Sequence, residues 1–366
     1  MALVSKPPAQ TDMVVEDGYI AWQRHRFSVL VCLLLVTLMA TFFWALLTGP
    51  MALTLEEVIQ GLQRSVGGEN VAGAADWVVR ELRLPRALLA MIVGAGLAVA
   101  GAVTQGVFRN PLADPGLIGV ASGAALAAVA VIVLSSTVLQ GWQALTGPFA
   151  LPLAAFCGGL LVTLIIYQLG TQGGQTQVAI LLLAGVAINV LAGAATGVLT
   201  YLADDQQLRD MTFWSMGSLA HGRWIEILAL MVFILPPLIW MLRSARLLNA
   251  LLMGEQVASH LGFDVQASKR WLLVGSALIV GAGVAVTGTI GFIGLVVPHL
   301  LRLVVGPDHR QLLPLSALAG ASLLLVADTL ARTVLAPADL PVGLVMALIG
   351  GPMFLILLLQ QTRRWH

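Results

Sequence analysis

The sequence predicts an all-α, polytopic membrane protein of about ten transmembrane helices that contains an inverted-topology repeat. Composition is the first observation: of 366 residues, 58% are hydrophobic and only 10% are charged, whereas soluble domains carry about 25% charged residues. So few charges cannot cover a compact protein in water, and most of its surface must face lipid. The other two observations are a series of apolar runs of roughly 20 residues and a small-residue segment that occurs twice.

Ten candidate spans follow from the apolar runs and from the charged and turn-forming residues between them. The first is long enough to cross the bilayer and too long for the apolar part of a signal peptide. Residues 1–26 are therefore expected to form an N-terminal extension, and residues 27–366 the membrane domain. The eighth span contains Gly291, Gly294 and Pro298 and is expected to be broken or irregular. The ten spans are 27–47, 87–107, 117–138, 150–169, 178–201, 224–242, 271–289, 291–305, 312–331 and 341–359.

The distribution of lysine and arginine predicts that both termini lie in the cytoplasm. With this orientation, twelve of the 19 basic residues, including both lysines, lie on the cytoplasmic side. The other residues are all arginines, a side chain suited to recognising carboxylates in pairs. A single arginine of this kind is equally explained by a side chain lying along the lipid interface. The outward arginines are Arg64, Arg80, Arg83, Arg86, Arg209, Arg223 and Arg332.

The repeated segment is Val93–Val103 in the second span and Val280–Ile290 in the seventh. The two copies are identical at seven of eleven positions. Because the second and seventh spans cross the membrane in opposite directions, the likeness indicates an inverted repeat, a transporter architecture with the substrate path between its halves. The alternative is chance similarity between two helices whose glycines suit close contact.

The longest predicted cytoplasmic loop, 243–270, contains apolar residues at helical spacing on both sides of Gly254. This pattern predicts two short amphipathic helices within about 247–262. They are too short to cross the membrane, so their apolar faces either lie on lipid or fill a groove on a partner. The few basic residues on their polar faces favour a partner protein.

A second cytoplasmic turn, Arg109–Gly116, contains Pro111 and Pro115. Two prolines end one helix and begin the next, so the turn is expected to be rigid. Its members Asn110 and Leu112 either project into the mouth of a pore or belong to a plain helix connector.

No catalytic or metal-binding group is predicted. The chain lacks the motif G-x-x-x-x-G-K-[ST] and so cannot hydrolyse ATP by the P-loop route, and a net charge of +1 gives no reason to expect a nucleic-acid partner. Asp328 is expected to pair with Arg332 one helical turn later. His299 and His221 are expected to be structural rather than metal ligands, and Ser218 beside His221 does not make the facing dyad of an intramembrane hydrolase.

Four motifs resemble the FecCD family, the permeases of type II ABC importers for iron-siderophores, haem and cobalamin. They are Arg83–Arg86, Gly101–Gly116, Gly291–His299 and Ala327–Arg332, in that order. The likeness extends from about Leu82 to Leu359, so the N-terminal extension lies outside it.

The resemblance implies a homodimer of ten-helix subunits in the bacterial inner membrane, surrounded by lipid, with the translocation path on the dimer axis. Two ATP-binding subunits, which hold ATP and Mg, dock on the cytoplasmic side, and a periplasmic substrate-binding protein docks outside. The chain itself is then a transport subunit without a cofactor and not an enzyme.

The resemblance also assigns site residues in three groups. Arg83, Arg86 and Arg332 receive the binding protein; Leu251, Leu252, Gly254, Glu255, Leu261 and Gly262 belong to the coupling helices that contact the ATPase; and Asn110 and Leu112 form a cytoplasmic gate. The family's second gate strip falls at Thr176–Ile180, which departs from the usual small hydroxylated residues, so no gate residue is assigned there.

Haem is the expected cargo, because the outer segment Asp204–Leu219 resembles haem permeases. A path rich in methionine, phenylalanine and alanine also suits a large planar apolar molecule. Ferric siderophores and cobalamin are the alternatives. A secondary transporter driven by an ion gradient is the alternative from another class, and the lack of a carboxylate chain within the spans argues against it.

Overall fold

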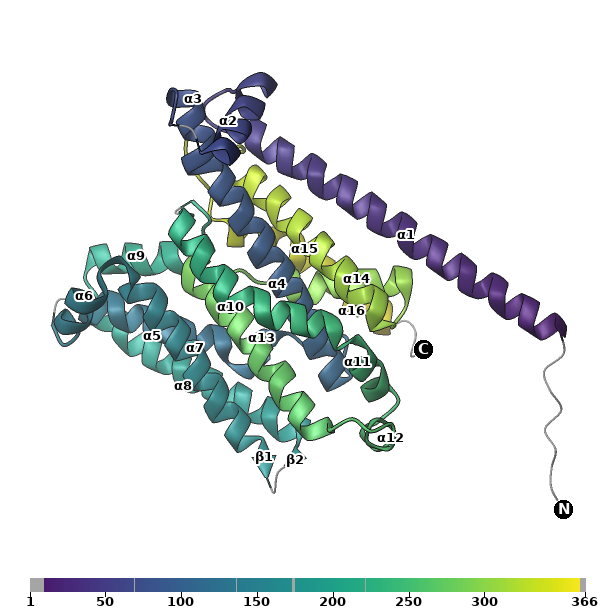
Figure 1. The fold of residues 1–366 in the computed structure, drawn as a ribbon. Coiled ribbons are helices and arrows are strands. Elements are labelled where there is room, and N and C mark those ends of the chain that lie inside the picture. The colour runs from purple at the N-terminus through teal and green to yellow at the C-terminus, as the bar shows by residue number, and fades with distance from the viewer. Residues whose placement is uncertain (1–9, 69, 136, 173–174, 221, 363–366) are drawn as a thin grey trace, which may run out of the picture.

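The computed structural model describes residues 10–362, apart from residues 69, 136, 173–174 and 221, and it is built mainly of helices (Figure 1). In this part of the chain, seven helices are long and apolar enough to cross a membrane. Three shorter apolar helices, Val120–Leu134, Ile293–Val305 and Val342–Ile356, accompany them. Together they match the ten predicted spans in order, so the prediction of an all-α polytopic protein is confirmed.

The first half of the described chain contains α1 (Gln10–Leu47), α2 (Leu55–Gly67), α3 (Ala74–Trp77), the π-helical turn η1 (Val78–Arg83), α4 (Leu84–Phe108), the 3-10 turn η2 (Pro115–Ile118), α5 (Val120–Leu134), α6 (Gln140–Thr146), η3 (Gly147–Phe149), α7 (Ala150–Leu169), β1 (Thr171–Gln172) and β2 (Gln175–Thr176). The second half contains α8 (Val178–Leu202), α9 (Asp205–Met216), α10 (Trp224–Arg243), α11 (Ala245–Leu252), α12 (Glu255–His260), α13 (Val265–Thr287), α14 (Ile293–Val305), α15 (His309–Ala331) and α16 (Val342–Thr362).

Helix α4 lies at the centre of the bundle and is buried along almost its whole length. It contacts α15, α13, α14 and α10, which surround it in Figure 1. Gly94 of α4 lies against the backbone of Gly320 on α15, and Gly101 lies against Gly294 on α14, so closely that a Cβ at either position would overlap backbone atoms. These small residues let the helix backbones approach, as is common in membrane bundles.

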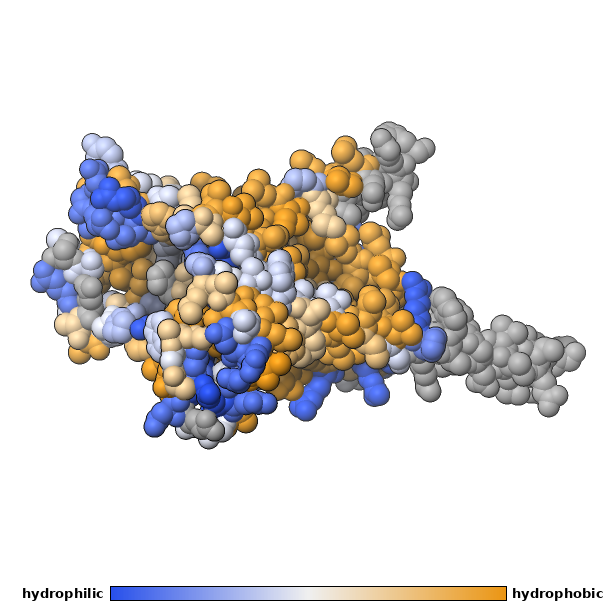
Figure 2. All heavy atoms as spheres, turned by 90° about the horizontal axis from the view of Figure 1, so that it is seen from above, coloured by the Kyte–Doolittle hydropathy of each residue, from blue (hydrophilic) through white to orange (hydrophobic). Residues whose placement is uncertain are grey.

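A second group of helices, α5, α7 and α8, lies on the other side of α13, and α1 lies against α15 on the opposite flank (Figure 1). Many large apolar side chains on α1, α8 and α16 are exposed. Figure 2, which views the molecule from the α2–α3 end, shows hydrophobic residues over much of the surface and hydrophilic residues gathered in separate patches. Such a surface suits lipid or another apolar partner rather than water.

The two copies of the repeated segment run in opposite directions, as predicted. Helix α4 begins beside η1, where Trp224 donates to the carbonyl of Arg80, and ends in contact with α11. Helix α13 begins just after α12 and ends beside α9, where the backbone N–H of Ser218 donates to Thr287 O. The repeated sequences therefore sit on two antiparallel, contacting helices.

Two predicted details of the spans differ from the structure. The first span, 27–47, is the second part of a longer helix that already begins at Gln10, so the boundary between the N-terminal extension and the membrane domain falls inside a continuous helix. The eighth segment is not broken, because α14 is one helix with Pro298 inside it. The expected irregular backbone is present at the start of the predicted segment, where Phe292 has a φ of 68°.

The search for apolar runs passed over two surface helices, α2 and α9, and the antiparallel β1–β2 hairpin. Both helices begin with a capping box, formed by Thr54 with Glu57 and by Asp204 with Gln207. That spacing is a recognisable sign of a helix start. Neither helix is apolar enough to resemble a span, which explains why the search missed them.

Candidate functional site

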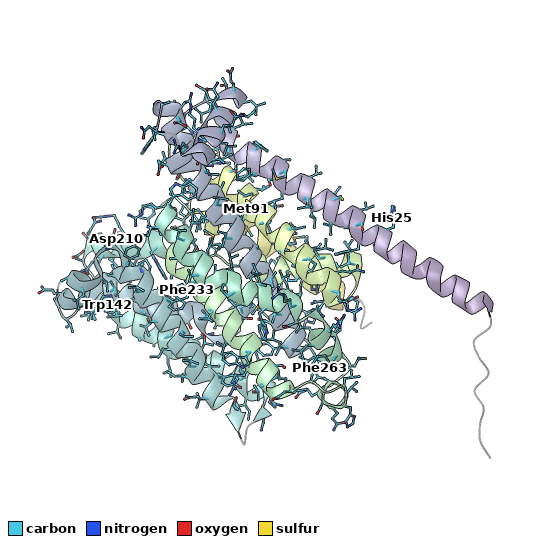
Figure 3. The ribbon with its side chains drawn as sticks, in the orientation of Figure 1. His25, Met91, Trp142, Asp210, Phe233 and Phe263 are labelled. Carbon is cyan, nitrogen blue, oxygen red and sulfur yellow. The ribbon has the colours of Figure 1, made fainter. Side chains whose placement is uncertain are left out.

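The predicted site residues lie at two opposite ends of the bundle. We name the end that carries Arg83, Arg86 and Arg332 the arginine end, and the end that carries α11, α12 and the turn 109–116 the α11–α12 end. In Figure 3, Asp210 of α9 lies toward the first of these, and Phe263, just after α12, lies at the second. Arg26 donates to the carbonyl of Val304 and lines a cavity together with Leu252 of α11. This arginine, which was predicted to be cytoplasmic, therefore lies at the α11–α12 end.

The three predicted docking arginines are brought together around one cavity of about 310 Å³, which Met51 and Asp339 also line. In the sequence, Arg83 and Arg86 lie just before the second span and Arg332 just after the ninth, so the approach of Arg332 to the other two is a result of the fold. Their side chains are engaged within the chain in three different ways.

Arg83 is only 4% exposed and holds the end of α1. It donates to Leu46 O at 2.6 Å and to Leu47 O at 2.9 Å, and also to Met51 O. The last carbonyls of a helix lack partners within the helix and carry a partial negative charge, so a guanidinium is a favourable cap there.

Arg332 is 5% exposed and donates to Ala45 O, also in the last turn of α1. Its Nε lies 3.9 Å from Asp328 Oδ2. Burial lowers the pKa of Arg332 to about 10, although the charge of Asp328 acts in the opposite direction. Two arginines from different helices thus cap the same end of α1.

The predicted pair of Asp328 with Arg332 is present, and Arg86 is a second and closer partner of Asp328 that the sequence did not predict. Arg86 Nε donates to both carboxylate oxygens of Asp328, at 2.9 and 3.0 Å, and Nη1 donates to Asp339 Oδ2 at 2.8 Å. The reason is the close crossing of α4 and α15 at Gly94 and Gly320. That crossing brings the first turn of α4 to the last turns of α15, a contact that sequence spacing does not reveal.

The two carboxylates differ in exposure. The side chain of Asp328 is 2% exposed and that of Asp339 is 37% exposed. Asp339 also lines a second cavity of about 510 Å³, formed largely by Asp210, Phe213 and Trp214 of α9 and by the end of α13. Sequence reasoning missed Asp339, because it lies in a short loop between two spans without a recognisable motif.

The predicted amphipathic pair between the sixth and seventh spans is present as α11 and α12, separated at Gly254, which has a φ of 117°. Leu251 is buried and anchors α11, whereas Leu252 and Leu261 are exposed. Gly262 has a φ of 87° and ends the pair. The Glu255 carboxylate accepts from Lys269 Nζ of α13 at 2.5 Å, which ties α12 to the bundle.

The predicted gate residues lie in the turn that follows α4. Arg109 takes a left-handed conformation with a φ of 50°, and the exposed Asn110 accepts the backbone N–H of Leu112 at 3.0 Å. Asp114 accepts the N–H of Gly116 and begins η2, and burial raises the pKa of its carboxyl group. The turn is therefore fixed by its own hydrogen bonds, in agreement with the rigidity expected from Pro111 and Pro115. Thr176, in the strip left unassigned, is buried in β2.

In the described part of the chain, no group of three or more His, Cys, Asp or Glu side chains is arranged to hold a metal ion. The hydroxyl of Ser218 accepts the backbone N–H of Ala220 in a turn, and His221 lies outside the described residues.

Three features define the class of polytopic membrane permeases. They are an antiparallel pair of repeated helices, backbone contacts between glycines in the centre of the bundle, and two short helices with exposed leucines at one end. Comparison with known proteins agrees with this class. The FecCD transport family matches residues 36–360, and the chain belongs to this family.

Individual relatives were found both by sequence and by structure. The hemin transport system permease protein HmuU of Yersinia pestis is 53% identical over 292 residues, covering 77% of this chain and 83% of HmuU. The cobalamin import system permease protein BtuC of Halobacterium salinarum is 46% identical over 289 residues, covering 79% of this chain and 75% of that protein. A metal-chelate type ABC transporter solved in an inward-facing conformation has a TM-score of 0.77 and 32% identity, covering 90% of this chain and 98% of its own.

Proposed function

We propose that this chain is the transmembrane permease subunit of an ATP-driven importer that carries haem from a periplasmic binding protein to the cytoplasm. The observation that carries the proposal is the 53% identity to a hemin permease over 77% of the chain. The second cavity at the arginine end supports the proposal. Phe213 and Trp214 line this space of about 510 Å³, which is in the size range of small-molecule sites. The chain is a transport component, and ATP is bound and hydrolysed on a separate subunit.

The ATPase is proposed to dock on α11 and α12. Their exposed leucines, Leu252 and Leu261, lie on short helices that are anchored by Leu251 and by the pair of Glu255 with Lys269. An apolar helix face held rigidly beside water suits a groove on a partner protein. The Leu252→Glu variant should weaken ATPase binding by at least about tenfold, since a charge replaces an apolar contact. Val334→Glu, a change at an exposed apolar residue of the arginine end, is the matched control and should bind normally.

The binding protein is proposed to dock at the arginine end, where carboxylates from its two lobes approach the cavity of Arg83, Arg86 and Arg332. Because Arg83 and Arg332 already hold α1, Arg86 has the most accessible arrangement: one of its partners, Asp339, lies partly in solvent. Charge pairs of this kind orient docking more than they add affinity. The functional unit is proposed to be a homodimer in the inner membrane with both termini in the cytoplasm.

The proposal is tested by haem uptake into proteoliposomes that contain this chain and its ATPase, with the binding protein supplied on one side at a time. ATP-dependent uptake only from the side of the arginine end supports direction, role and cargo together. Binding-protein-stimulated ATP hydrolysis without haem uptake would reject haem, and cobalamin is the next cargo to try, since cobalamin permeases are 46% and 41% identical. Ferric siderophores are the third. Uptake that collapses with the ion gradient while ATP is constant would instead indicate a secondary transporter.

A further inference from the structure

A hydrogen-bonded cluster joins α11 to the beginning of α15. Asn249 of α11 donates from Nδ2 to Asp308 Oδ1 at 2.6 Å, and its Oδ1 accepts the backbone N–H of His309 at 2.9 Å. His309 Nδ1 lies 3.0 Å from the same oxygen. Asp308 is the N-cap of α15 and also accepts the N–H of Arg310. The Asn249 amide therefore bonds the cap of a transmembrane helix and cannot be reversed without losing the backbone bond.

The other side of His309 lies against the last turn of α4. A Cβ added to Gly106 would lie 2.7 Å from His309 Nε2 and 3.1 Å from Leu248 Cδ2. Gly106 is therefore in direct contact with α15 through His309 and with α11 through Leu248. Both helices therefore contact α4 at this glycine.

Gln105, the neighbour of Gly106, ties the same turn to α14. Pro298 has no N–H, so it leaves the carbonyl of Gly294 without its usual partner in α14. Gln105 Nε2 donates to Gly294 O at 3.2 Å and to Leu295 O at 3.3 Å. Its Oε1 accepts from Arg302 Nη1 at 2.9 Å. The close contact of Gly101 with Gly294 brings α4 near enough for this side chain to reach.

The gate turn begins from this fixed point. Asn110 N–H donates to Gln105 O at 3.1 Å, and Arg109 N–H donates to Gly106 O at 3.3 Å. Gln105 is thus bonded to α14, Gly106 packs against α11 and α15, and the carbonyls of both residues bond the turn 109–116. A displacement of α11 therefore reaches the turn through Leu248 and His309, the two side chains that lie against Gly106.

We infer that Asn249 is a positioning residue that makes α11, the cap of α15 and the gate turn move as one unit. The inference rests on the proposed roles of α11 in ATPase coupling and of the turn 109–116 as a gate. Leu248 keeps α11 in contact with α4 by apolar packing alone, whereas Asn249 fixes its register along α15 by hydrogen bonds. Without the amide, α11 keeps its docking surface but can slide relative to the helices that control the turn.

The test uses the full chain with its ATPase in proteoliposomes and measures two ratios. The first is cargo taken up per ATP hydrolysed. The second, which needs no cargo, is the change that ATP causes in the labelling rate of a Leu112→Cys reporter by a membrane-impermeant thiol reagent, with Cys32 and Cys157 replaced by serine. Asn249→Ala should lower both ratios by about tenfold, equal to about 1.4 kcal/mol, while ATPase binding and hydrolysis persist. The control is Gln311→Ala, which truncates a second amide in the cavity that Asn249 lines. It should change neither ratio.

A donor–acceptor exchange guards against a folding defect. Asn249→Asp alone sets two carboxylates against each other and should uncouple the complex. Adding Asp308→Asn restores one donor facing one acceptor and keeps a good N-cap residue on α15, so the double variant should regain most of the wild-type ratios.

Three results would overturn the inference: unchanged ratios in Asn249→Ala, a loss of ATPase binding equal to the loss of coupling, or a double variant that stays as uncoupled as Asn249→Asp. Failure of the proposed function has a different signature. If the wild-type complex shows ATP-dependent labelling but no haem uptake, the cargo is wrong and the labelling ratio still tests Asn249.

Discussion

The two ends of this permease join their helices by different chemistry. At the arginine end, Arg86 meets Asp328 through hydrogen bonds to both carboxylate oxygens, buried between α4 and α15. At the α11–α12 end, the ion pair of Glu255 with Lys269 ties α12 to α13, but the contacts of α11 with α15 and of α4 with α14 are made by neutral amides. Each amide bonds one charged side chain and one or more backbone groups. Gln105 bonds Arg302, and Asn249 bonds Asp308.

The difference indicates which end is built to stay fixed. Removing one member of a buried ion pair leaves an uncompensated charge, which is very costly. A neutral amide costs less to displace, because even its hydrogen bond to a charged group contributes only about 1.5–3 kcal/mol net. The arginine end therefore suits a constant docking platform, and the α11–α12 end suits contacts that re-form during each cycle.

The largest expected effect comes from Asp328→Ala. Arg86 and Arg332 would remain buried without their shared carboxylate, so the variant should lose about 3–5 kcal/mol of stability. Thermal unfolding of the purified chain in detergent measures this. Asp339→Ala removes the exposed partner of the same arginine and should cost about 1 kcal/mol or less. Equal losses in the two variants would contradict the contrast between a buried and an exposed pair.

Gly101→Ala should come next. The added methyl group meets the backbone of Gly294, so α4 and α14 must separate, at a cost of about 1–3 kcal/mol. The control is Gly281→Ala in the other copy of the repeat, where a Cβ makes ordinary contacts of 3.6 Å or more; this change should be neutral or stabilising. A stable Gly101→Ala protein with normal uptake would show that α14 moves away freely.

Thr54→Ala should have a smaller and local effect. It removes the side-chain cap of α2, worth about 1 kcal/mol, and should speed amide hydrogen exchange in α2 but not in α4. The N–H and hydroxyl of Thr54 lower the pKa of Glu57. The contribution of Glu57 is therefore complete above its ordinary pKa and is lost as pH falls through the lowered value. If the rate of amide hydrogen exchange in α2 is the same after the substitution and at acid pH, the capping box does not stabilise this helix.

The smallest effect concerns docking. Asp339→Asn removes the negative charge of the partly exposed partner of Arg86 Nη1, so an incoming carboxylate from the binding protein meets less competition. Affinity at low salt should rise by a few-fold, in keeping with about 1 kcal/mol for an exposed pair. Binding of the protein to permease in nanodiscs measures the change, with Glu226→Gln, which alters a pair with Arg223 nearer α10, as the control. A decrease in affinity would mean that Asp339 itself contacts the binding protein.

Much of this architecture was predictable from local sequence. Runs of apolar residues predicted all ten spans, because lipid demands long helices, and helical spacing around Gly254 predicted α11 and α12. The same local signals misjudged Pro298. A proline inside a helix leaves one carbonyl without its usual donor, and here Gln105, almost 190 positions away in sequence, supplies a replacement.

The site was predicted less completely than the fold. The predicted orientation drew attention to seven arginines, and the family resemblance selected Arg83, Arg86 and Arg332 among them. Neither predicted that Arg86 reaches Asp328, because this contact forms only where two glycines let α4 and α15 approach. Asp339 and Asn249 carry no motif and become informative only through the residues that face them. Their roles depend on tertiary contacts, which sequence spacing does not encode.

Helix α1 is held at two depths, by Arg83 and Arg332 at its last turn and by Arg26, which reaches Val304 on α14. The points of attachment are about 20 residues apart, or about 30 Å along a helix, which is the thickness of the hydrocarbon core of a bilayer. Because Arg26 and the last turn bound the apolar part of α1, this part cannot tilt on its own to match a thicker or thinner membrane. Around α1, the lipid must therefore adjust its thickness to the protein, and transport should depend on acyl-chain length.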